Sequence, residues 1–101
     1  MSPGAEDDRE RSLALLRAQH QFPGAYDLSV IAVSTAAVAA AVRAAVEDGL
    51  AEPLGRDAHQ VIPSTGGKYA SHRFVVYLRA AEDVLALYDR VKQVTGVVTI
   101  L

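Results

Sequence analysis

The sequence has 101 residues, of which half are hydrophobic and 22% are charged, and its formal net charge is −2 at neutral pH. A chain of this length and hydrophobicity builds one compact core, so we expect a single folded domain rather than a disordered protein. The near-neutral charge argues against binding to nucleic acid or to anionic membranes, which usually needs a basic excess. Because cysteine is absent, disulfides, thiolate chemistry and cysteine-ligated metals are excluded.

Two features of the sequence predict a cytoplasmic protein. The segment from Glu6 to Arg11 is charged, whereas an export signal would become apolar there. The alanine-rich segment that starts at Ala36 contains Arg43 and ends in two acids, so it is too short and too charged to span a membrane.

We expect an N-terminal segment, residues 1–21, followed by one domain, residues 22–101. Met1 to Ala5 contain a proline and a glycine, and we expect them to be mobile. Glu6 to His20 carry charges around an apolar stripe, which predicts a short amphipathic helix lying on the domain. The leucines of this segment are Leu13, Leu15 and Leu16.

Tyr26 to Val33 is the first predicted strand, because its residues alternate between two faces. One face carries Tyr26, Leu28, Val30 and Ala32, and the other carries Asp27, Ser29, Ile31 and Val33. Ser34 or Thr35 then offers a hydroxyl to cap the N-terminus of a helix over Ala36 to Asp48. Gly49 is the expected C-cap of that helix.

The second half of the domain begins with a polar segment, Arg56 to Ile62, whose polarity suits a strand at the edge of a sheet. A glycine-containing turn joins it to the most β-prone segment, Tyr69 to Arg79, so the two predict a hairpin. Ala81 to Thr95 has the apolar spacing of a helix on a core, and Gly96 ends it. Val97 to Leu101 is a final β-branched strand.

The predicted order is a helix followed by β-α-β-β-α-β. Two β-α-β halves with right-handed crossovers fold as a four-stranded antiparallel sheet backed by two helices. We therefore predict an α+β, ferredoxin-like domain with an extra N-terminal helix, and the strands that begin at Tyr26 and Tyr69 in its centre.

Several stretches resemble the family of small uncharacterised bacterial proteins typified by YbeD. They are Phe22-Pro23, the segment Pro63 to Ser71 with its Gly66-Gly67-Lys68-Tyr69 turn, and Val84-x-x-Leu87-Tyr88 leading to Val97-x-x-Ile100-Leu101. The resemblance implies a ferredoxin-like fold akin to ACT regulatory domains, with no established activity. This chain has Ser29, Ala32 and Gly66 where family members usually have lysine, glycine and lysine, respectively.

The turn before the strong strand is the first candidate site. It offers hydroxyls, glycine amides and one cation at one place, groups that suit a carboxylate or phosphate. The residues of this predicted ligand loop are Ser64, Thr65, Gly66, Gly67, Lys68, Tyr69 and Ser71. A nucleotide-binding P-loop is excluded, because the turn joins two strands and no Ser or Thr follows the lysine. The alternative is a plain hairpin turn with positive-φ glycines and a solvated lysine.

The side of the sheet away from the helices is the second candidate site. Its predicted interface residues are Ile31, Val33, Arg73, Val75 and Tyr77. A contiguous apolar patch usually marks an interface, so we expect a homodimer, unless the N-terminal helix folds back over the patch through its leucines. Aromatic and basic residues on this face leave single-stranded nucleic-acid binding as the alternative function.

No set of acid, base and nucleophile is visible in the sequence, so we expect a protein that is not an enzyme. His20, His59 and His72 lack the spacing of metal ligands, and His72 is predicted to be a hydrogen-bonded core residue. Neither a cofactor nor a metal is expected. The sequence thus predicts a non-catalytic regulatory or interaction module of ACT-like type that binds a small anionic ligand or a protein partner.

Overall fold

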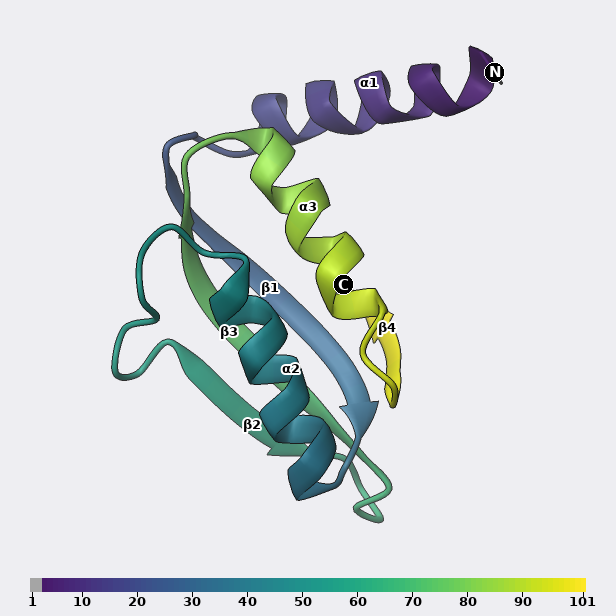
Figure 1. The fold of residues 1–101 in the computed structure, drawn as a ribbon, viewed down its shortest axis with the longest axis vertical. Helices are drawn as coiled ribbons and strands as arrows, with labels where there is room; N and C mark the ends of the chain where they lie inside the picture. The colour runs from purple at the N-terminus through teal and green to yellow at the C-terminus, as the bar shows by residue number, and fades with distance from the viewer. Residues whose placement is uncertain (1–2) are drawn as a thin grey trace.

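The computed structural model describes residues 3–101 and contains three helices and four strands in the predicted order (Figure 1). The elements are α1 (Pro3–Gln19), β1 (Gly24–Val33), α2 (Ala36–Asp48), β2 (His59–Pro63), β3 (Tyr69–Leu78), α3 (Ala81–Lys92) and β4 (Val97–Ile100). The chain is an α+β protein with one antiparallel sheet of four strands.

The strands lie in the order β2-β3-β1-β4. The two central strands pair along their whole length, from Gly24 opposite Leu78 to Val33 opposite Tyr69. The prediction that β1 and β3 are central is therefore confirmed, and so is the edge position of the polar strand β2. Helices α2 and α3 lie side by side over one face of this sheet (Figure 1).

The hydrophobic core lies between the sheet and these two helices. Alternate residues of the central strands point into it, as the sequence predicted. They are Tyr26, Leu28, Val30 and Ala32 of β1, and Ala70, His72, Phe74, Val76 and Leu78 of β3. The helices contribute Val42, Val46, Val84, Leu87 and Val91.

Local hydrogen bonds fix where the helices begin and end. The Thr35 hydroxyl accepts a bond from the Val38 N–H at 3.1 Å and so caps α2, as predicted. Asp83 caps α3, because its Oδ2 accepts bonds from the N–H of Arg79 and of Ala80. Gly49 does follow α2, but its φ is −87°, and its lack of a side chain instead leaves space for Leu87 and Arg90 of α3.

Several predicted boundaries were wrong, and β1 begins at Gly24 rather than at Tyr26. Helix α1 begins at Pro3, because proline suits the first turn of a helix, where its missing N–H is not needed. Met1 and Ser2 lie outside the described residues. Strand β2 begins at His59, after a turn in which the Ala58 N–H bonds to the Gly55 carbonyl. Strand β3 ends at Leu78, and helix α3 at Lys92, before Gly96.

Helix α1 lies across the end of the helical layer, beside the start of α3 (Figure 1). Its Leu13 is 4% exposed, Leu16 packs against the core, and Arg17 forms a 2.9 Å ion pair with Glu82 of α3. Leu15, by contrast, is 59% exposed. The alternative in which this helix covers the far side of the sheet is therefore wrong, because the helix packs against α3 and is joined to it by the Arg17–Glu82 ion pair.

Candidate functional site

The sheet has a second face that points away from the helices, which we call the open face. In an antiparallel sheet, residues paired across strands share a face, so the register identifies its members. They are Ala25, Asp27, Ser29, Ile31 and Val33 of β1, Tyr69, Ser71, Arg73, Val75 and Tyr77 of β3, Gln60 and Ile62 of β2, and Thr99 of β4. All five predicted interface residues lie on this face, and Val75 and Tyr77 are 52% and 46% exposed.

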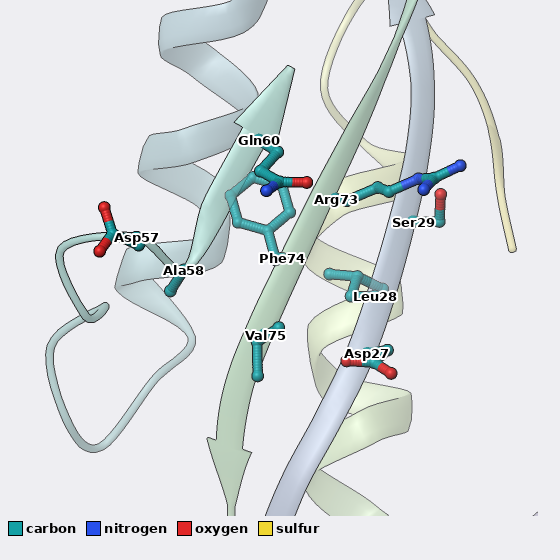
Figure 2. Close-up of a pocket in the computed structure, with 9 residues that line it drawn as sticks. All are labelled: Asp27, Leu28, Ser29, Asp57, Ala58, Gln60, Arg73, Phe74 and Val75. Carbon is teal, nitrogen blue, oxygen red and sulfur yellow. The ribbon is translucent and has the colours of Figure 1, made fainter. Parts of the chain in front are cut away.

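A hollow of about 510 Å³ opens on this face (Figure 2). Strands β1, β2 and β3 and the loop before β2 contribute its lining, which consists of Asp27, Leu28, Ser29, Asp57, Ala58, Gln60, Arg73, Phe74 and Val75. The Arg73 side chain extends across β1 beside Ser29. A second hollow, of about 360 Å³, shares Ala58 and Val75 with the first and is lined mainly by apolar residues near Tyr77.

The charges around the hollow are mixed. Its lining includes two carboxylates, Asp27 and Asp57, and one guanidinium, Arg73. Among the side chains described for residues 7–101, none of these three forms an ion pair within the chain. Because the lining has more acidic than basic side chains, it is poorly suited to binding a simple anion. Exposed, unpaired charges of both signs instead suit a partner whose own charges are complementary in position.

The predicted ligand loop lies at one end of the sheet, and none of its residues lines the hollow. Its polar groups bond mainly within the loop: the Ser64 Oγ accepts a bond from the Tyr69 N–H, and the Ser64 carbonyl accepts one from the Gly67 N–H. The Lys68 ammonium lies 5.5 Å from the Tyr69 ring centroid. Gly66 and Gly67 have φ of 91° and 73°, the positive values expected of a hairpin turn.

Exposure also differs within this loop. Ser64 to Lys68 are exposed, whereas Tyr69 and Ser71 are half-buried and belong to β3. The loop is further tied to the fold by a bond from the Ser34 N–H to the Lys68 carbonyl. These contacts position the turn firmly at the end of the sheet.

On the helical side of the sheet, a chain of hydrogen bonds links α2 to the hairpin. Glu47 accepts a bond from Arg43 at 2.7 Å, Arg43 donates to His59 Nδ1 at 3.0 Å, and His59 Nε2 lies 3.0 Å from His72 Nδ1. A guanidinium can only donate hydrogen bonds, so His59 Nδ1 must be the acceptor of the Arg43 bond. The ring proton of His59 is therefore on Nε2, which donates a hydrogen bond to Nδ1 of His72. The predicted role of His72 as a buried, hydrogen-bonded histidine is confirmed.

This arrangement lowers the pKa of both imidazoles and so favours their neutral form. Burial lowers the pKa of His72, which is 1% exposed, and burial followed by the neighbouring His72 and Arg43 lowers the pKa of His59. The His59 ring also stacks on Phe74, with the centroids 4.1 Å apart. Among residues 3–101, no group of three side chains is placed to hold a metal ion. The histidines therefore join the hairpin to α2 in this structure.

Sequence analysis missed two parts of these sites. It did not include Asp27 or Gln60 among the interface residues, although the alternation along β1 and β2 places both on the same side as Ile31. It also treated His59 and His72 as separate. In the hairpin, His59 lies opposite Phe74 and His72 lies opposite Val61, so the two histidines are diagonal neighbours on one face. Numbering the strand pairs outward from the turn would have shown this.

A protein-family model matches most of the chain. The model of a family described as "Protein of unknown function (DUF493)" matches residues 17–101, which include the whole sheet, α2 and α3. No curated protein matches the chain. Within residues 3–101, none of the helices is long and apolar enough to cross a bilayer.

Proposed function

We propose that this chain, which belongs to the DUF493 family of proteins of unknown function, is a non-catalytic interaction module whose recognition surface is the open face of its sheet. The observation that carries the proposal is the unequal covering of the sheet. Two helices cover one face, and the helix that could have covered the other packs on the helical layer instead. The strand order β2-β3-β1-β4, with two helices over one face, supports our assignment of a ferredoxin-like fold of the YbeD-like, ACT-like type.

The composition of the open face supports a binding role. It combines Val75, Tyr77 and Ile62, all more than 40% exposed, with the unpaired charges of Asp27 and Arg73. A contiguous apolar area with embedded polar groups is typical of recognition surfaces. No general base lies beside a nucleophile on this face, so we assign it binding without chemistry.

The test is to locate binding on the protein. A thermal-shift screen with metabolites and single-stranded RNA selects compounds that bind the folded state, and amide chemical shifts of the labelled protein then map each hit. We expect the shifts to fall on Ser29, Arg73, Val75 and their neighbours. We expect Val75→Asp to abolish them, whereas Leu15→Asp, a matched change of an exposed apolar residue on α1, should not.

Chemical-shift changes confined to the loop from Ser64 to Lys68 would contradict this proposal and would favour the predicted ligand loop as the binding site. Shifts confined to α2 and α3 would contradict both. If single-stranded RNA is the hit, affinity should fall steeply with added salt, because RNA binding releases counterions.

A further inference from the structure

The identity of the partner follows from the charge pattern of the open face. We propose that two copies of this chain pack open face against open face around a two-fold axis, with Asp27 of each copy paired with Arg73 of the other. This inference rests on the proposed function, since it names the partner that the same surface recognises.

The open face is self-complementary in charge. Asp27 and Arg73 are the charged side chains at the paired strand positions of this face, one acid and one base, and Asp57 of the loop before β2 lies at the edge of the same hollow. Asp27 lies opposite Val75, and Arg73 lies opposite Ser29, so the two charges are diagonal neighbours on the two central strands. A two-fold rotation that brings one Asp27 onto the partner copy's Arg73 also brings the reciprocal pair together. Two ion pairs therefore form from one acid and one base per chain.

The surroundings of the two charges favour their pairing with another molecule. Both side chains are exposed, and neither is in an ion pair within residues 7–101. Val75, Tyr77 and Ile31 lie beside them on the same face. When a second copy covers these apolar residues, water is excluded from the ion pairs and the electrostatic attraction strengthens. In this register each acid meets a base, whereas a two-fold axis passing through Asp27 or through Arg73 would bring like charges together, so the ion pairs also favour one arrangement.

The size of the face sets the expected strength of the dimer. Four strands spaced about 4.8 Å apart, each rising about 3.3 Å per residue, give this sheet a flat footprint of roughly 450 Å² per copy. The accessible surface buried on such a face is larger than its flat footprint, and the contact still falls at the lower end of specific interfaces, where association is often weak and reversible. The dimer should therefore form in the upper micromolar range rather than persist on dilution.

The experiment is sedimentation equilibrium of the full chain from about 10 micromolar to about 1 millimolar, the range in which so small a contact dissociates. Asp27→Arg gives a face with two arginines, and Arg73→Asp gives a face with two aspartates. We expect the wild-type chain to dimerise and each variant alone to associate at least about tenfold more weakly. An equimolar mixture of the two variants should recover association, because each then meets the opposite charge.

Two controls separate this result from general effects of charge. Asp89→Arg and Lys92→Glu reverse charges of a surface ion pair on α3, and both should leave the wild-type association unchanged. Circular dichroism checks that each variant remains folded.

A wild-type chain that is monomeric throughout the range would overturn the second-copy inference. So would a mixture that associates no more tightly than the single variants. If a monomeric chain still binds a metabolite or RNA through the open face, the proposed function stands and only the partner is wrong. If it is monomeric and every hit maps elsewhere, both are overturned.

Discussion

The two faces of the sheet share the same strands but differ in how far their side chains are exposed. On β3, Phe74 and Val76 point into the core and are at most 2% exposed, whereas Val75 and Tyr77 point the other way and are about half exposed. The backbone is common to both faces, so the difference depends entirely on what covers them. Helices α2 and α3 make one face a core, and the other remains available to a partner.

The largest expected effect compares two aromatic residues of β3. Phe74→Ala should destabilise the protein by about 3–5 kcal/mol, because it removes a fully buried ring and leaves a cavity. Tyr77→Ala, which truncates a ring that is 46% exposed, should cost about 1 kcal/mol or less in the monomer. Urea unfolding measured on dilute protein checks both values. Similar losses for the two variants would show that the open face is not open in solution.

The next effect concerns pH and the histidines on the covered face. The pKa values of His59 and His72 are lowered in the folded state, so the unfolded chain takes up protons first as the pH falls below the ordinary value of 6.5. Stability should be complete above that pH and decline below it, by at most about 1.4 kcal/mol per pH unit for each histidine. Urea unfolding between about pH 8 and about pH 5 measures this slope.

The matched control for the pH effect is the double substitution His59→Gln with His72→Gln. Glutamine does not titrate in this range, so the difference in slope between the two proteins isolates the histidines from the carboxylates. Equal slopes would show that burial does not lower the pKa of either imidazole in the folded state.

A smaller effect is expected at the hairpin turn. Gly67 has φ of 73°, so Gly67→Val should destabilise by about 1–2 kcal/mol through backbone strain, although no atom lies near the added side chain. Gly55→Ala is the control, since its new methyl group meets only Ala58 at 3.8 Å and should change stability little. Thermal unfolding compares the two. An unchanged midpoint for Gly67→Val would mean that the turn tolerates another conformation.

These regions also differ in how far the sequence could predict them. Alternation along β1 and β3 assigned Leu28 and Phe74 to the core and Ile31 and Val75 to the open face, because a strand places successive side chains on opposite sides. The N-cap at Thr35 was predictable for an equally local reason. Periodicity and capping depend only on neighbouring residues, so one sequence is enough to recognise them.

The parts that were missed depend on contacts between distant segments. The bond between His59 and His72 requires the exact pairing of β2 with β3, and the bond to Arg43 requires α2 to cross the hairpin. The position of α1 depends on its contacts with α3, which include the ion pair between Arg17 and Glu82. The hollow includes Asp57 and Ala58 from an irregular loop, for which no periodic pattern exists.

We propose that the open face serves recognition and contributes little to the core. One substitution tests this proposal most directly. Val75→Asp should change the monomer's stability by about 1 kcal/mol or less, as expected for an exposed strand position. The same variant should lose the concentration-dependent association of the wild-type chain. Val76→Asp, one residue further along the strand, should instead unfold the domain, because it buries a charge. A Val75→Asp protein that associates like the wild type, or that is destabilised as severely as Val76→Asp, would contradict the account.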